Sequence, residues 1–247
     1  MQLIDHPSPN HGPRADGAAI DLLILHYTGM ASGEAALARL CDPAAEVSAH
    51  YLIDEDGRVF RLVPEQRRAW HAGSAYWAGE RDVNSRSIGI ELVNPGHELG
   101  YRPFPDAQMA ALEALTLDIL ARHPIPAHRV LGHSDVAPAR KRDPGELFDW
   151  ERLAEAGVGA WPRGVARRHR VTRSFGRDDH DEAIAEVQDG LRRYGYEVEP
   201  SGRLDAATEL VLFAFQRHFR PWRVDGRLDG ESAARLRALL AQRIDLR

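Results

Sequence analysis

The stretch "LILHYTG" (residues 23–29) poses the main question of this sequence. A short aliphatic run, typical of a buried strand, leads directly into His26, which is followed by an aromatic residue, a hydroxyl and a glycine. A lone histidine in such a place is most often a core or surface residue that hydrogen-bonds to its neighbours. Whether His26 has a chemical role depends on what other segments supply beside it.

The composition excludes several classes of protein. The chain has 247 residues, 43% of them hydrophobic and 28% charged, as in soluble globular proteins. A formal net charge of -5 and the lack of a basic stripe argue against nucleic acid as the main partner. The only cysteine, Cys41, excludes an internal disulfide framework and a multi-cysteine zinc site. The longest apolar runs, such as "LLIL", are too short for a membrane span.

The first 160 or so residues alternate between strand and helix patterns after a proline-rich, extended arm of about twenty residues. Alternation of this kind predicts a sheet covered by helices, an α/β protein. The best helix carries apolar residues at three-to-four spacing, and Asp106 is its expected cap. The predicted elements are a strand at 19–28, a hairpin at 47–63 around Asp56-Gly57, a strand at 86–94, the helix at 106–123 and a strand leading into a loop at 128–136.

The composition changes after residue 162. Residues 163–180 are highly charged and weakly patterned, which predicts a linker. Beyond them, the sequence Gly-Arg-Leu-Asp at 202–205 recurs at 226–229, and each copy opens a helical pattern with its aspartate as the expected cap. Two copies are too few for a solenoid, so residues 181–247 are predicted to form a compact three-helix module.

Two further polar residues bear on the role of His26. His133, in "LGHSDVAP", also ends a predicted strand, and Asp143 follows in "RKRDPG". Two imidazoles and one carboxylate, with a fourth position open, form a ligand set for a catalytic zinc ion. The same donors suit other divalent metals. From spacing alone, the alternative that His133 and Asp143 only hydrogen-bond within their loops stays open.

Five motifs occur together and in one order: "LILHYTG", "VSAHYLIDEDG", "AWHAG", "NSRSIGIELVN" and "GHSDVAPARKRDPGELFDW". By these motifs the chain resembles the zinc-dependent type-2 N-acetylmuramoyl-L-alanine amidases, which are related to the peptidoglycan recognition proteins. The resemblance assigns residues 1–162 to a catalytic domain. Through "VQDGLRRYGY", "GRLDAAT" and "FQRHF", residues 181–247 resemble a small peptidoglycan-binding module.

The resemblance implies a fold and a catalytic site. The fold is a mixed central β-sheet flanked by helices, with the metal in a groove at the edge of the sheet, followed by the helical module. The implied metal is Zn²⁺, with His26, His133 and Asp143 as ligands. Glu91, in "IGIELVN", is then the catalytic carboxylate, and Lys141 is the cation beside the metal.

Three further residues are expected to contact substrate. His71, in "AWHAG", is placed in the groove, with a packed histidine beside Trp70 as the alternative. Asn84 either binds substrate or only shapes its loop. Arg142 either meets acidic groups of the stem peptide or belongs to a solvated face.

The implied reaction is hydrolysis of the amide between the lactyl group of N-acetylmuramic acid and L-alanine, in peptidoglycan or anhydro-muropeptides. A non-catalytic recognition protein is the alternative, but the presence of all three ligand residues with Glu91 and Lys141 argues against it. A metallopeptidase that cuts between peptide residues has similar ligands, and the extended motifs argue against that alternative.

The start of the chain, "MQLIDHPSPNHGPRADG", has neither the basic nor the apolar region of a signal peptide, which favours the cytoplasm. The alternative is a periplasmic enzyme whose leader is missing from this sequence. In the cytoplasmic case, the module is expected to cover the active site or support the fold rather than bind polymer.

Overall fold

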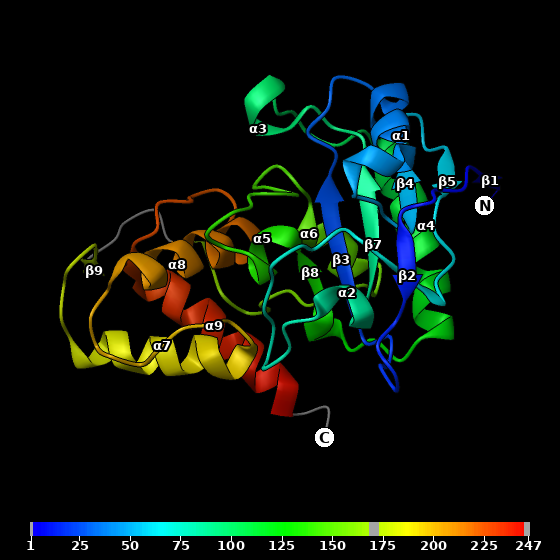
Figure 1. Ribbon diagram of the computed structural model, residues 1–247. Coiled ribbons are helices and arrows are strands. Elements are labelled where there is room, and N and C mark those ends of the chain that lie inside the picture. The colour runs from blue at the N-terminus through cyan, green and yellow to red at the C-terminus, as the bar shows by residue number, and fades with distance from the viewer. Residues whose placement is uncertain (1, 168–172, 245–247) are drawn as a thin grey trace.

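A six-stranded mixed sheet forms the centre of the protein (Figure 1), whose computed structural model describes residues 2–167 and 173–244. Neighbouring strands run parallel except β4 and β5, which form the predicted antiparallel hairpin. The strands in spatial order are β1 (Leu3–Asp5), β5 (Val59–Arg61), β4 (Tyr51–Ile53), β7 (Ser87–Leu92), β3 (Leu22–Tyr27) and β8 (Val130–Gly132). The expected mixed sheet with flanking helices is confirmed.

Strand β3 lies between two parallel neighbours and is buried on both faces. Leu22 and Ile24 belong to one buried cluster, and Leu23 and Leu25 belong to another. Successive side chains of a strand point to opposite faces, so both faces of β3 need apolar residues. This explains why the sequence shows an unbroken aliphatic run before His26.

Helix α4 (Asp106–Arg122) covers one face of the sheet with its apolar side, and α1 (Gly33–Cys41) packs against the β4–β5 hairpin. Ser32 caps α1 through its hydroxyl. The prediction that Asp106 caps α4 is wrong. Pro105 occupies the N-cap position, and Asp106 lies in the first turn of the helix. The short helices are α2 (Val83–Arg86), α3 (Gly96–Leu99), α5 (His133–Val136) and α6 (Trp150–Glu155), with 3₁₀ turns at Pro43–Ala45 and Ala127–Arg129.

The extended arm at the start of the chain is joined to the rest of the fold. Strand β1 pairs with β5 at the sheet edge, and β2 (His11–Pro13) pairs with β6 (Arg67–Ala69). The side chain of Arg14 then donates hydrogen bonds to four backbone carbonyls, those of Glu65, Asn84, Ser85 and Ser87.

The C-terminal part is the predicted three-helix unit, α7 (Glu182–Tyr194), α8 (Ala206–Phe219) and α9 (Gly230–Ile244), called here the helical module. Asp205 and Asp229 accept hydrogen bonds from the backbone N–H groups of Thr208 and Ser232, as their predicted capping roles require. Strand β9 (Ser174–Phe175), within the predicted linker, pairs with β10 (Leu228–Asp229). Residues 168–172 of that linker and 245–247 of the predicted module lie outside the described residues.

The helical module packs beside β8 and α5 (Figure 1) and shares a core with the sheet. Leu22, Leu131 and Val136 fall in the same buried cluster as Tyr196 and Phe215. In the part of the chain that the structure describes, no helix is both long and apolar enough to cross a membrane.

Gly195 allows a close contact within this shared core. It has a φ of +143°, and a Cβ built on it would lie 2.5 Å from the ring of Trp77. We expect Gly195→Ala to lower the free energy of unfolding by roughly 2–4 kcal/mol, through backbone strain plus overpacking. Urea unfolding monitored by circular dichroism measures this.

The matched control is Gly79→Ala, since Gly79 also has a positive φ, +94°, but a Cβ there meets nothing within 4 Å. Strain alone predicts a loss of roughly 1–2 kcal/mol at Gly79. Equal losses at the two positions would show that the Trp77 contact contributes nothing.

Candidate active site

Three parallel strands bring the first residues of the site together. His26 on β3 pairs in register with Glu91 on β7, and Leu25 pairs with Gly132, the last residue of β8. His133 follows directly. Because parallel strands end at the same edge of a sheet, these three polar side chains gather at one place.

Asp143 completes a buried cluster with the two histidines. The Nδ1 atoms of His26 and His133 lie 2.9 Å apart, and each lies 3.0–3.1 Å from Oδ2 of Asp143. The loop that carries Asp143 is fixed by its carbonyl, which accepts a hydrogen bond from the backbone N–H of Ser134. One ligand atom from each of the three residues lies within 4.8 Å of the others, the arrangement that a shared cation requires.

The second ring nitrogen of His133 decides which atom is free to bind. Nε2 of His133 lies 3.0 Å from the carbonyl oxygen of Ala72. A carbonyl only accepts, so Nε2 carries the hydrogen and Nδ1 keeps its lone pair. That lone pair points at Asp143 and His26.

A chain of three hydrogen bonds fixes His26 in the same tautomer as His133, with the hydrogen on Nε2. The Ser87 hydroxyl donates to the Val83 carbonyl at 2.6 Å, so its oxygen accepts from Nε2 of His71 at 3.1 Å. Nδ1 of His71 is then the acceptor for Nε2–H of His26, also at 3.1 Å. We therefore assign the Nδ1 lone pair of His26, like that of His133, to the inside of the cluster.

The donor set fits a cation. Two imidazole lone pairs and a carboxylate oxygen converge at hydrogen-bonding distance with no proton left to share between the rings. Burial is the main cause that lowers the pKa of His26 to about 4, so the imidazole is neutral near pH 7, as a ligand must be. Burial opposes ionisation of Asp143, but electrostatic interaction with the neighbouring rings of His133 and His26 lowers its pKa overall.

Glu91 lies beside this cluster in an unusual state. Burial and the negative charge of Asp143 raise the pKa of Glu91 well above its ordinary value, and the ammonium of Lys141 opposes the shift. Oε2 of Glu91 is buried and has no hydrogen-bond partner among the residues that the structure describes. A carboxyl group of raised pKa that is free to exchange a proton is typical of a general acid or base.

A groove of about 420 Å³ opens onto the cluster. Four of the predicted catalytic and ligand residues line it, together with His71 and Arg142. Its walls combine basic, acidic and aromatic side chains, which suits a polar substrate with both sugar and peptide parts. The residues among its lining that the sequence singled out are Glu91, Lys141, His133, Asp143, His71 and Arg142.

The predicted substrate contacts differ in their placement. Asn84 is outside the groove lining, and its Oδ1 accepts hydrogen bonds from the backbone N–H groups of His71 and Ala72, which shapes that loop. His71 lines the groove, but both of its ring nitrogens have partners. Arg142 is exposed and pairs with Glu98 at 3.2 Å.

Two residues that support the site were not found from the sequence. Ser87 anchors the hydrogen-bond chain to His26, and Arg14 holds the backbone around it through the Ser85 and Ser87 carbonyls. Neither residue belongs to a local pattern that distinguishes it from an ordinary strand serine or arm arginine.

Fold and site together define a hydrolase with a candidate metal centre at the end of a mixed sheet. The comparisons with known proteins identify the family: residues 16–146 match the profile described as N-acetylmuramoyl-L-alanine amidase, and residues 180–236 match that of a peptidoglycan binding domain. The chain belongs to the N-acetylmuramoyl-L-alanine amidase family, and it is a catalytic member, an amide hydrolase.

Three similar proteins support this assignment. The N-acetylmuramoyl-L-alanine amidase AmiD of Escherichia coli (strain K12) is 41% identical over 234 residues, 90% of this chain and 82% of the relative. The structure of AmiD with its substrate anhydro-N-acetylmuramic acid-L-Ala-D-gamma-Glu-L-Lys has a TM-score of 0.77 at 38% identity, covering 93% of this chain and 92% of that one.

Of the other two proteins, one is named for an anhydro sugar and the other has been solved with a bound anhydromuramic peptide. The 1,6-anhydro-N-acetylmuramyl-L-alanine amidase AmpD of Enterobacter cloacae is 38% identical over 164 residues, 60% of this chain and 86% of the relative. AMPDH3 from Pseudomonas aeruginosa, solved in complex with anhydromuramic pentapeptide, has a TM-score of 0.74 at 34% identity and covers 93% of this chain and 95% of that one.

The hydrogen-bond chain behind His26 gives a testable expectation. Ser87→Ala removes the acceptor for Nε2–H of His71, so His71 and His26 are no longer held in one tautomer. If the cluster holds a divalent cation, we expect the affinity for that cation to fall about 10- to 100-fold, as for other residues that orient a metal ligand. Equilibrium competition with a chromophoric chelator measures the change.

The control for Ser87→Ala is Thr116→Ala, which removes another buried hydroxyl. Thr116 donates to the carbonyl of Leu112 within α4, on the far side of the sheet. Equal cation affinities for the two variants and the parent would contradict the orienting role of Ser87.

Proposed function

We propose that this amidase is zinc-dependent and that His26, His133 and Asp143 hold the ion. The observation that carries the proposal is the convergence of two imidazole lone pairs and a carboxylate beside Glu91, a half-buried residue whose Oε2 atom is buried. Two nitrogen donors and one oxygen donor with a groove at the open position are typical of catalytic zinc sites. When bound, a zinc ion polarises a carbonyl and lowers the pKa of bound water.

Glu91 serves as the proton carrier in this proposal. It accepts a proton as water attacks the carbonyl carbon of the lactyl amide, and it donates that proton to the amino group of L-alanine as the carbon–nitrogen bond breaks. The products are the lactyl carboxylate and the free peptide amine. A raised pKa suits this role because the same group must hold the proton and then release it.

Lys141 supplies positive charge to the developing oxyanion. It lines the groove beside Glu91 and acts electrostatically on both Glu91 and His26. Arg142, farther out, is proposed to meet acidic groups of the stem peptide, and His71 is proposed to combine a place on the groove wall with its hydrogen bond to His26.

The proposed substrate is an anhydro-muropeptide, the class of molecule bound in the structures of the AmiD and AMPDH3 relatives. We expect release of the tripeptide from anhydro-N-acetylmuramic acid-L-Ala-D-gamma-Glu-L-Lys, and loss of release with a metal chelator. Mass spectrometry of parallel digests of this compound and of intact sacculi measures both.

Cleavage of the soluble fragment alone would indicate a recycling role, whereas release of peptides from sacculi would indicate action on the wall. Cleavage that survives complete removal of metal would contradict the zinc proposal. Residence in the cytoplasm stays a prediction, which fractionation of cells that express the natural gene tests.

Glu91→Gln keeps the shape of the side chain and removes its ability to exchange a proton. We expect kcat to fall about 10²- to 10⁴-fold with little change in zinc affinity or substrate binding. Glu98→Gln is the matched control, because Glu98 also lines the groove but is largely exposed. A Glu91→Gln enzyme with near-parental kcat would exclude Glu91 as the proton carrier.

Lys141→Met tests the electrostatic coupling between Lys141 and Glu91. Lys141 lowers the pKa of Glu91, so its removal raises that pKa further. Activity that requires ionised Glu91 is lost as the pH falls through this pKa, and the acid limb of the kcat/KM profile therefore moves to higher pH. Arg142→Met, the control, should leave the limb in place, and a limb that stays fixed in Lys141→Met would argue against the coupling.

A further inference from the structure

Asp135 lies two residues after His133, and its side chain is buried. Its carboxylate accepts three hydrogen bonds: from the backbone N–H of Gly132 at 2.8 Å, from Nδ1 of His218 at 2.7 Å and from the hydroxyl of Tyr196 at 2.6 Å. The bond to Gly132 closes the turn at the start of α5, so Asp135 fixes the backbone immediately before and after His133.

Two of these three donors belong to the helical module. Tyr196 follows α7, and His218 lies in the last turn of α8, 61 and 83 residues from Asp135 in sequence. A buried carboxylate is tolerated only when its oxygen atoms are satisfied. Without the module, Asp135 would keep one hydrogen bond and lose the other two, and the turn that carries His133 would lose its anchor.

His218 is itself held between aromatic rings. Its ring stacks on Trp150 at a centroid distance of 3.7 Å and on Phe219 at 3.8 Å. Trp150 is the first residue of α6, and its ring lies within 3.3 Å of a Cβ built on Gly132. Contacts from the module and from the sheet domain therefore meet on the same short turn.

Arg217, the residue before His218 in α8, is linked through Glu146 and His97 to Tyr27 on the groove wall. Nε of Arg217 lies 3.9 Å from Glu146, which pairs with His97 at 3.2 Å. His97 in turn contacts the hydroxyl of Tyr27 at 2.9 Å. Tyr27 follows His26 and lines the groove.

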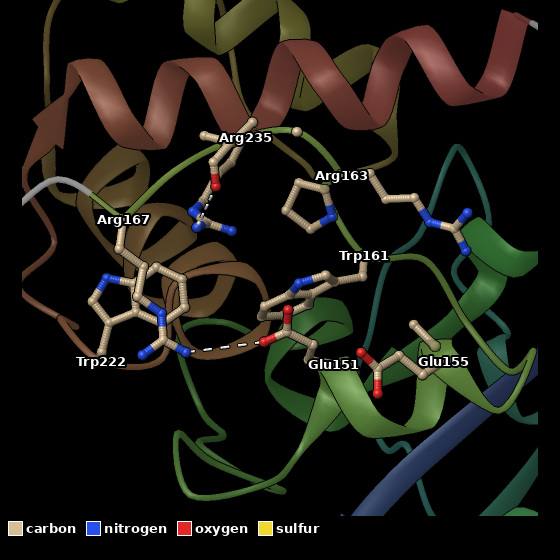
Figure 2. A pocket seen from close by; sticks show the side chains of 11 residues that line it. Glu151, Glu155, Trp161, Arg163, Arg167, Trp222 and Arg235 are labelled. Carbon is tan, nitrogen blue, oxygen red and sulfur yellow. Dashed lines mark hydrogen bonds and ion pairs between the residues drawn. The ribbon is translucent and has the colours of Figure 1, made fainter.

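The described residues of the joining segment up to Arg167 pack against the rest of the protein, as Figure 2 shows. The guanidinium of Arg167 lies 4.1 Å from the ring centroid of Trp222 and 3.9 Å from Glu151 of α6. Arg235 of α9 lies over the same indole at 4.3 Å, and Gln242 donates to the carbonyl of Trp161. Figure 2 places Glu151, Trp161, Arg167, Trp222 and Arg235 around one cavity between α6 and the module.

We propose that the helical module is a positioning element of the catalytic centre, with Tyr196 and His218 orienting the His133 turn through Asp135. This inference rests on the proposed role of His133 as a zinc ligand. It assigns to the module a task other than attachment to polymer, since the side of α8 that carries His218 is buried against the amidase part.

The test uses the full chain and measures zinc affinity by competition with a chromophoric chelator. His218→Leu keeps bulk but removes the donor to Asp135, and we expect affinity to fall about 10- to 100-fold. Tyr196→Phe removes one hydroxyl and should give a smaller loss. His218→Asn, which can place an amide N–H near the position of Nδ1, should recover part of the affinity.

The control is Gln216→Leu, which disturbs α8 without touching Asp135, because Gln216 binds the backbone of Asp225 and Gly226. Unchanged affinity in a folded His218→Leu protein, or equal losses in His218→Leu and Gln216→Leu, would overturn the inference.

His133→Ala, measured in parallel, separates failure of the inference from failure of the zinc proposal. If His133→Ala binds zinc as tightly as the parent, the proposed ligand set is wrong, and the positioning role falls with it. If His133→Ala loses the zinc but His218→Leu does not, only the positioning role is wrong.

Discussion

The register of three parallel strands, β7, β3 and β8, is the constraint on which the site depends. It places His26 opposite Glu91 and sets His133 one residue beyond the partner of Leu25. A slip of one residue would turn the whole side-chain set of β3 to the opposite faces. Such a slip would carry His26 to the face of Leu23 and Leu25, where it would bury an imidazole in an apolar cluster, so the packing of that face holds the register of β3.

The buried histidines show why geometry alone does not make a ligand. Each imidazole must present a lone pair from one particular nitrogen, and its other nitrogen must carry a hydrogen. The Ala72 carbonyl sets this state for His133, and the chain through His71, Ser87 and Val83 sets it for His26. Each of these hydrogen-bond chains ends on a backbone carbonyl, which can only accept a hydrogen bond. The direction of every hydrogen bond in the two chains is therefore fixed.

The sequence predicted the strands and the main helix because these leave local signals, whereas the assignment of His26, His133 and Asp143 to one cluster depended on the resemblance to the amidases. Aliphatic runs, three-to-four spacing and a turn at Asp56-Gly57 are all read within a few residues. The capping role of Asp106 was predicted wrongly, since Pro105 already takes the cap position. The partnership of Asp135 with His218 spans 83 residues and could not be predicted, because a hydrogen bond between distant residues has no periodicity along the chain.

The loop from Ala137 to Asp143 carries two opposite charges, those of Lys141 and Asp143, that both act on the carboxyl group of Glu91. Asp143 raises the pKa of Glu91 and Lys141, two residues earlier, lowers it, so the balance depends on how rigidly this loop is held. The backbone N–H of Lys141 donates to the Ala137 carbonyl, closing a turn. Arg140 then clamps the loop to the Ala72 and Ser74 carbonyls. The Ala72 carbonyl also accepts a hydrogen bond from His133. This one backbone oxygen therefore helps to orient the His133 imidazole and to hold the loop that carries Lys141 and Asp143, the two charges that act on Glu91.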